Sequence, residues 1–214
     1  MYTVFRALLN AKYIHTENDG DFAIERKGKN IWFFFQESNS KIDWKNNFDF
    51  PVKPYRNMGD KWYCHRGFLR VWKSIEPYIN EALQDETIEK VYIAGYSHGG
   101  AIATLCHEYV WFNRPDLREN LHGYVFGSPR VFWGFRIKPE LKERWKNLHI
   151  IRNGTDLITH LPPKVFGFKD VNTVYQLEPC SQESHIKIKS VNYHYPDNYY
   201  NSLVHDFIVD GYII

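Results

Sequence analysis

The sequence predicts an α/β protein in which helices pack on a mostly parallel β-sheet. Three observations lead to this prediction. Four short runs of residues are almost wholly apolar, as strands buried on both faces are. Longer stretches with apolar side chains at helical spacing lie between these runs. The chain has 214 residues, which suits a substantial core, and we expect a single domain over residues 1–214.

The expected elements alternate along the chain. The strands are predicted at residues 31–35, 91–94, 124–126 and 148–151, with a weaker candidate at 174–177. The helices are predicted at residues 67–83, 99–112 and 139–145. We expect Pro77 to kink or split the first helix, because proline removes a backbone donor. Strand, helix and strand in succession indicate parallel neighbours joined by crossovers.

The composition excludes several classes of protein. Charged residues make up 24% of the chain and apolar residues 43%, which is typical of a globular protein and not of a disordered one. The 27 basic residues exceed the 25 acidic ones by only two, and no basic stripe is present, so we expect no nucleic-acid partner. The aromatic share is 17%, which indicates a thick core, a sugar- or lipid-binding groove, or both.

The cysteines and the apolar runs bear on the compartment. Cys64, Cys106 and Cys180 are far apart and odd in number, so we expect reduced thiols, two of them buried, and no disulfide framework. We find no secretory signal at the start and no apolar run of about 18–20 residues that would span a membrane. The expected location is therefore the cytoplasm, with secretion open as the alternative. No feature of the sequence indicates an oligomeric state.

The motif that carries chemistry is Gly95-Tyr-Ser-His-Gly-Gly100, a G-x-S-x-G pattern between an apolar strand and a helix. A nucleophilic serine must project from a sharp turn, so the residues at 95 and 99 have to be small. The backbone N–H of His98 then lies at a helix N-terminus, where the helix dipole favours a developing oxyanion. We interpret Ser97 as a nucleophile; the alternative is a chance match in a glycine-containing loop.

Four further motifs accompany this one in a fixed order. They are Phe35-Gln-Glu-Ser-Asn-Ser-Lys-Ile-Asp-Trp44, His65-Arg-Gly-Phe68, Phe126-Gly-Ser-Pro-Arg130 and Asp156-Leu-Ile-Thr-His-Leu-Pro-Pro163. Together with the serine motif they resemble the class 3 lipase family, whose fungal members are triacylglycerol lipases and feruloyl esterases. The resemblance covers about residues 31–168 and implies an α/β-hydrolase fold with a Ser-Asp-His triad in that chain order.

The resemblance implies that Asp156 is the triad acid. It follows an apolar strand, and a carboxylate at the carboxyl end of a strand can hold the imidazole tautomer and stabilise the imidazolium. The alternative is that Asp156 only caps a turn after Asn153 and Gly154. Asp170 and Asp197 are the spare candidates.

The base is expected after the acid, on a carboxyl-terminal loop, which leaves His185, His194 and His205. In the family the histidine lies near the carboxyl end, before a short aromatic segment. Ser202-Leu-Val-His205-Asp-Phe207 fits that description best. We predict His205 as the base, with His194 as the alternative, since a neutral imidazole can take the serine proton and return it.

The chain departs from the family at the oxyanion loop and at the lid. The family usually reads Arg-Gly-Ser/Thr after the first long strand, whereas this chain reads Gln36-Glu-Ser38. Ser38 aligns with the second oxyanion donor; the alternative is that it only caps the loop. Residues 40–50 occupy the lid position, where Trp44 and Phe48 are four residues apart and would share one face of a helix, among polar neighbours in the sequence. We expect weak or absent interfacial activation and a preference for short or soluble esters.

The sequence thus predicts a serine ester hydrolase that acts on a small-molecule or lipid ester through an acyl-enzyme. No cofactor is implied, and the His-Glu-x-x-His pattern of zinc hydrolases is absent. An acyltransferase or a thioesterase would use the same triad. A non-catalytic lipid- or glycan-binding module remains an alternative from a different class, suggested by the altered loop at residues 36–38.

Overall fold

The computed structural model describes residues 1–17, 20–36, 52–55, 62–134 and 143–210. Three predictions fall wholly or mostly on other residues. The oxyanion donor Ser38 and the lid at residues 40–50, with Trp44 and Phe48, lie outside the described residues, as does most of the helix predicted at 139–145.

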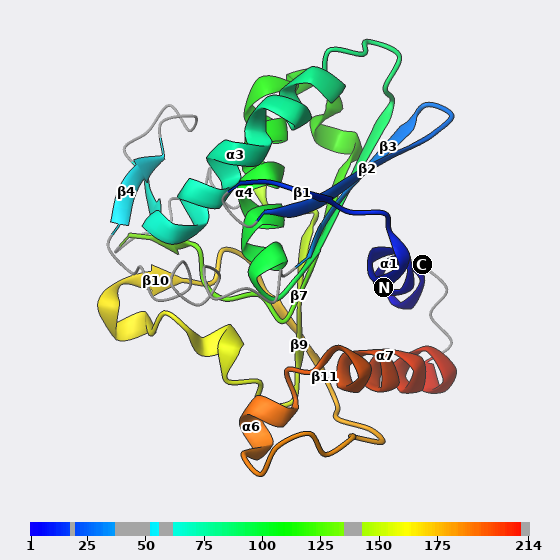
Figure 1. Cartoon of the computed structure of the whole chain (residues 1–214), viewed down its shortest axis with the longest axis vertical. Coiled ribbons are helices and arrows are strands. Elements are labelled where there is room, and N and C mark those ends of the chain that lie inside the picture. Colours follow the sequence, from blue (N-terminus) through cyan, green and yellow to red (C-terminus); the bar gives the residue numbers. More distant parts are fainter. Residues whose placement is uncertain (18–19, 37–51, 56–61, 135–142, 211–214) are drawn as a thin grey trace.

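A seven-stranded sheet in the order β1-β2-β3-β6-β7-β9-β11 forms the centre of the fold (Figure 1). Its strands are β1 Ile14–His15, β2 Asp21–Lys27, β3 Asn30–Gln36, β6 Lys90–Tyr96, β7 Leu121–Phe126, β9 Leu148–Asn153 and β11 Val174–Leu177. Neighbours from β3 to β11 are parallel, and β1 and β2 join the edge in antiparallel fashion. The predicted α/β class with a mostly parallel sheet is therefore confirmed, and each predicted strand is present.

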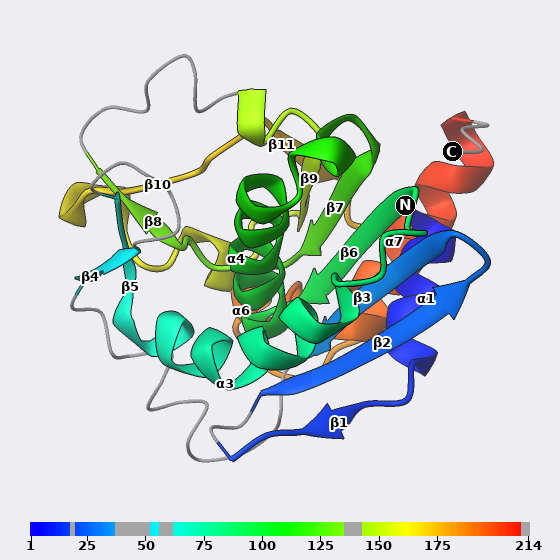
Figure 2. The same cartoon turned by 90° about the horizontal axis from the view of Figure 1, so that it is seen from above.

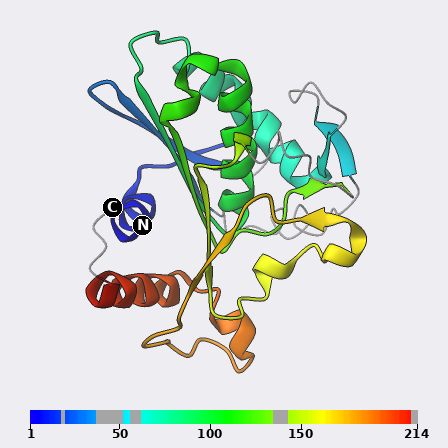
Figure 3. The same cartoon turned by 180° about the vertical axis from the view of Figure 1, so that it is seen from behind.

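Two pairs of helices cover the two faces of this sheet (Figure 3). The helices of one face are α3, Arg66–Ala82, and α4, His98–Asn113; those of the other are α1, Tyr2–Asn10, and α7, Pro196–Asp210. The expected break at Pro77 does not split α3. Pro77 and Lys73, whose carbonyl loses its partner, both lie on the exposed side of the helix, where water can replace the missing donor.

The side chains of β3 explain why both faces need cover. Ile31, Phe33 and Phe35 belong to the hydrophobic cluster under α3 and α4, whereas Phe34 belongs to the cluster under α1 and α7. Successive side chains of a strand point to opposite faces, so a continuous apolar run is buried only between two helical layers.

A small antiparallel sheet, in the order β10-β8-β5-β4, lies beside α3 and α4 (Figure 2). Its strands are β4 Val52–Tyr55, β5 Trp62–His65, β8 Phe132–Trp133 and β10 Phe168–Lys169. The remaining described elements are short: η2 Pro115–Asn120, η3 Ile158–His160, η4 Lys164–Phe166 and α6 Lys189–Asn192. The small sheet was not predicted, because strands of two to four residues carry too short a pattern.

The three cysteines are free thiols, with Cys64 and Cys106 buried and Cys180 partly exposed, which confirms that part of the prediction. Among the described residues, no helix is both long and apolar enough to cross a membrane. Because β3, β6, β7, β9 and β11 run parallel, their carboxyl ends meet at one edge of the sheet, and the loops there carry the predicted site.

Candidate active site

Ser97 occupies a strained turn between β6 and α4. Its φ of 54° and ψ of −125° are costly for a residue with a side chain, and such strain persists only where the surroundings enforce it. The flanking glycines leave no space for a Cβ atom. A Cβ on Gly95 would lie 2.2 Å from the carbonyl oxygen of Gly99, and one on Gly99 would lie 2.2 Å from that of Phe35. The turn therefore holds the serine hydroxyl at the carboxyl edge of the sheet.

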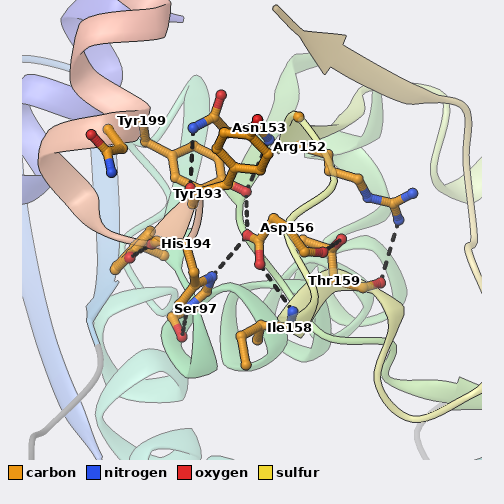
Figure 4. A network of polar contacts seen from close by, with 12 residues as sticks. Ser97, Arg152, Asn153, Asp156, Ile158, Thr159, Tyr193, His194 and Tyr199 are labelled. Carbon is orange, nitrogen blue, oxygen red and sulfur yellow. Dashed lines mark hydrogen bonds and ion pairs between the residues drawn. The ribbon is translucent and has the colours of Figure 1, made fainter. Parts of the chain in front are cut away.

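Three polar side chains form a hydrogen-bonded line at this edge (Figure 4). The Oγ atom of Ser97 lies 2.7 Å from Nε2 of His194, and Nδ1 of His194 lies 2.8 Å from Oδ2 of Asp156. They come from the end of β6, the short segment between α6 and α7, and the loop after β9. A hydroxyl, an imidazole and a carboxylate in this order make a nucleophile, a base and a group that orients the base.

His205 does not reach Ser97, and the prediction of this histidine is corrected to His194. His205 lies inside α7, where its side chain is 43% exposed and its Nδ1 is 4.0 Å from a carboxylate oxygen of Asp206. The segment was expected to be a loop, but Pro196 begins a helix there. A proline in the first helical position followed by an aspartate is a helix-start signal, and the last loop residues before it include His194.

The other candidates have separate partners. His185 pairs with Asp197, Nε2 to Oδ2 at 2.6 Å, beside the start of α7. Asp170 lies 3.0 Å from Nε of Arg130 and 2.8 Å from Nζ of Lys164. Burial alone would raise the pKa of Asp170, but the side-chain hydrogen bond from Lys164 and the charges of Arg130, Lys164 and Arg152 together lower it. None of these three candidates contacts Ser97 in the described contacts, which leaves His194 as the partner of Ser97 and Asp156 as the partner of His194.

The Asp156 carboxylate is fully buried and accepts three hydrogen bonds. Its Oδ1 accepts the backbone N–H of Ile158 at 2.9 Å. Its Oδ2 accepts both His194 and the hydroxyl of Tyr199, the latter at 2.6 Å. A buried carboxylate is tolerated only where donors replace water, and these donors meet that need. Tyr199 was not identified from the sequence, since nothing local marks a tyrosine that contacts a residue 43 positions away.

In the loop before α7, the backbone carbonyl groups of Tyr193 and His194 each accept a hydrogen bond from a side chain. The hydroxyl of Tyr96 donates to the backbone oxygen of His194. The side-chain amide of Asn153 donates to the backbone oxygen of Tyr193 at 3.1 Å. Neither residue was singled out by the sequence, although Tyr96 is the residue immediately before the nucleophile. Together they set the height of the imidazole above Ser97.

His98, the predicted oxyanion donor, is the first residue of α4. The first N–H groups of an α-helix have no acceptor within the helix, and the helix dipole adds a partial positive charge there. The imidazole of His98 is buried, with its ring centroid 5.3 Å from that of Phe68 on α3, so its role at the site rests on its backbone. Within the described ranges, no group of three or more His, Cys, Asp or Glu residues is placed to hold a metal ion.

The fold and the line of Ser97, His194 and Asp156 define an α/β-hydrolase. Residues 32–166 match the family described as Lipase (class 3), which is more than half of the chain. The chain therefore belongs to the class 3 lipase family, as the motifs indicated. It is 29% identical over 166 residues to a lipase of Rhizomucor miehei, covering 73% of this chain and 44% of the relative. It is 28% identical over 165 residues to secreted mono- and diacylglycerol lipase 1 of Fusarium solani, covering 73% and 46%.

Solved structures agree on the fold. The Rhizomucor miehei lipase propeptide complex gives a TM-score of 0.65 at 24% identity, over 90% of this chain and 64% of that one. The triacylglyceride lipase of the same organism gives 0.61 at 26% identity, over 78% and 65%. The chain spans less than half the length of the curated relatives above. The name of the Fusarium solani relative includes the word secreted, so the comparisons do not support a cytoplasmic location.

Proposed function

We propose that this chain is a serine ester hydrolase that forms an acyl-enzyme on Ser97. The observation that supports the proposal most directly is the continuous line from Ser97 Oγ through His194 to Asp156. A serine hydroxyl is a weak nucleophile by itself, and an imidazole at 2.7 Å can remove its proton as it attacks. Family membership points to the same chemistry.

The reaction is built on these contacts. Ser97 Oγ attacks the ester carbonyl while His194 Nε2 takes the hydroxyl proton, and the oxyanion lies at the N-terminus of α4. His194 then gives this proton to the leaving alcohol as the carbon–oxygen bond breaks. Water attacks the acyl-enzyme as His194 takes its proton, and His194 returns that proton to Ser97 Oγ as the acid product leaves. Asp156 holds Nδ1 and stabilises the imidazolium throughout. We propose the backbone of His98 as one oxyanion donor and Ser38 as the second.

The proposed substrate is a lipid or small-molecule ester, and the names of the relatives suggest acylglycerols. We keep a preference for short or soluble esters as part of the proposal, because most neighbours of Trp44 and Phe48 in the sequence are polar. We also propose that residues 1–214 form one domain. Rates for p-nitrophenyl esters from acetate to palmitate test the preference. A sharp rise in activity when tributyrin passes its solubility limit contradicts it.

A fluorophosphonate probe tests the triad directly. The wild-type chain should be labelled covalently, Ser97→Ala should not be labelled, and His194→Ala should react at least about 100-fold more slowly, since the base supplies roughly that factor or more. His205→Ala is the matched control and should react like the wild type. Equal labelling of the wild type and Ser97→Ala, or a loss with His205→Ala alone, contradicts the proposal.

The alternatives differ in the fate of the acyl-enzyme. An acyltransferase passes the acyl group to an alcohol, so the ratio of acid to new ester in the presence of glycerol distinguishes it from a hydrolase. A non-catalytic binding module has no need for a nucleophile, a base and an acid in one line, and the geometry of Ser97, His194 and Asp156 favours catalysis.

A further inference from the structure

Two tyrosines flank the His194–Asp156 pair and come from opposite parts of the chain. Tyr96 is the last residue of β6, and Tyr199 lies in the first turn of α7. Their ring centroids are 5.8 Å apart at an interplanar angle of 74°. The imidazole of His194 stacks on Tyr96 at 5.3 Å and meets Tyr199 edge-on at 6.5 Å. We call Tyr96 and Tyr199 the tyrosine brace.

The hydroxyl of Tyr199 has one defined direction. It accepts the backbone N–H of Asn153 at 3.1 Å and donates to Oδ2 of Asp156 at 2.6 Å. Because one side of the oxygen is occupied by the Asn153 N–H, its own proton points to the carboxylate. Burial, with the nearby charge of Asp156, raises the pKa of Tyr199 well above its ordinary value of 10, so this group stays a donor at working pH.

The same carboxylate oxygen serves the catalytic imidazole. Oδ2 of Asp156 accepts Nδ1–H of His194 at 2.8 Å and the Tyr199 hydroxyl at 2.6 Å. Two donors on one oxygen fix the rotation of the carboxyl group and share its negative charge. The orientation of His194 therefore depends on a hydroxyl that touches neither Ser97 nor His194 by a hydrogen bond.

We infer that Tyr199 is a positioning residue that sets the direction and the charge of Asp156 toward His194, while Tyr96 holds the imidazole from the other side. This inference rests on the proposed function. The close fit of the cluster supports it. A Cβ on Gly127, whose φ is +60°, would lie 3.1 Å from Cε1 of His194 and 3.2 Å from the Tyr199 hydroxyl. The backbone of Gly127 therefore packs closely against both the imidazole of His194 and the hydroxyl of Tyr199.

Loss of the Tyr199 hydroxyl has a predicted direction. With one donor fewer, the Asp156 oxygen carries more negative charge and attracts the imidazolium of His194 more strongly. The imidazole then keeps its proton to a higher pH and returns it to the leaving alcohol less readily. The acid limb of the rate profile should therefore move to higher pH, and kcat should fall while KM stays nearly constant.

Other groups around the pair do not replace this hydroxyl. Titratable or charged residues on the neighbouring elements include Tyr96 on β6, Arg152 on β9, His160 on η3, Tyr193 after α6 and Asp197 on α7. His160 Nδ1 lies 2.9 Å from the backbone oxygen of Asp156, and Arg152 donates to the backbone of Thr159. Among the described contacts, only Tyr199 and His194 bind the Oδ2 atom of Asp156.

The test is Tyr199→Phe, which keeps the ring and removes the hydroxyl. The matched control is Tyr200→Phe, since Tyr200 lies next to it on α7 and its hydroxyl bonds that of Tyr2 at 2.8 Å, away from the site. With methyl butyrate, an alkyl ester whose leaving alcohol must take the proton, Tyr199→Phe should lose roughly tenfold in kcat and shift its acid limb upward by about half a pH unit or more. Tyr200→Phe should keep the wild-type profile.

The measurements separate three failures. An unshifted acid limb in a folded Tyr199→Phe protein overturns the inference, whether or not kcat falls, because a packing defect lowers activity without moving the limb. If melting shows that Tyr199→Phe is unfolded, Tyr96→Phe replaces it as the test of the brace; an unchanged kcat and hydrolysis profile there overturns the inference. Failure of the fluorophosphonate probe to label wild-type Ser97 contradicts the proposed function itself.

Discussion

The buried imidazole of His107 makes the stability of this fold depend on pH, and His107→Leu should remove that dependence. His107 lies on α4 against β7, and a Cβ on Gly123 would come within 2.9 Å of its ring. Neither ring nitrogen has a hydrogen-bond partner among the described residues. Burial, with smaller contributions from His122 and His149, lowers the pKa of His107 from 6.5 to about 3.

The sign and size of the effect come from the two pKa values. The unfolded chain binds a proton at His107 below about pH 6.5, whereas the folded chain does so only below about pH 3. The stability is therefore fully present above pH 6.5 and is lost as the pH falls through this window. Each pH unit corresponds to about 1.4 kcal/mol, so the loss from this residue at pH 5 is about 2 kcal/mol.

Leucine fills a similar volume and binds no proton. Between pH 8 and pH 5, His107→Leu should lose about 2 kcal/mol less of its free energy of unfolding than the wild type. Urea denaturation followed by tryptophan fluorescence at each pH measures this difference. Gly134→Ala, where the added Cβ meets nothing within 4 Å, is the control and should lose as much stability as the wild type does. An equal loss in His107→Leu and wild type refutes the reasoning.

Other predictions concern single side chains. Burial raises the pKa of Glu108 from 4.5 to about 7, although the ion pair with Arg144 opposes the shift. The contribution of Glu108 to the free energy of unfolding therefore falls as the pH rises from 4.5 to 7. Urea denaturation at each pH should show that Glu108→Gln abolishes this fall. Gly99→Ala would place a Cβ 2.2 Å from the Phe35 carbonyl and should lower both the melting temperature and probe labelling of Ser97. Gly134→Ala, with nothing within 4 Å, should change neither. A thiol reagent should modify one cysteine rapidly in the native protein and three after denaturation, and two fast thiols would contradict the burial described above.

The strands of the parallel sheet and the helices α3 and α4 were predictable because their patterns are local. β3, β6 and β9 are short apolar runs, and α3 repeats apolar side chains at helical spacing. The strand β2 was missed, since Glu25, Arg26 and Lys27 make the end of this strand look like a loop. The helices α1 and α7 were also missed, because α1 is only 9 residues long and the apolar residues of α7 do not form a regular stripe.

The sequence by itself determined two of the three proposed catalytic residues. Ser97 is marked by the small residues that its turn requires. Asp156 is marked by the Asp156–Pro163 motif, which resembles that of the family, and both signals are local to the chain. The choice between His194 and His205 was decided only by the tertiary structure. Both histidines follow the acid by tens of residues. Only the start of α7 at Pro196 places His194 2.7 Å from Ser97 Oγ and His205 inside the helix, away from the serine. The role of Tyr199 is likewise a property of packing, because it depends on two segments that meet only in the folded protein.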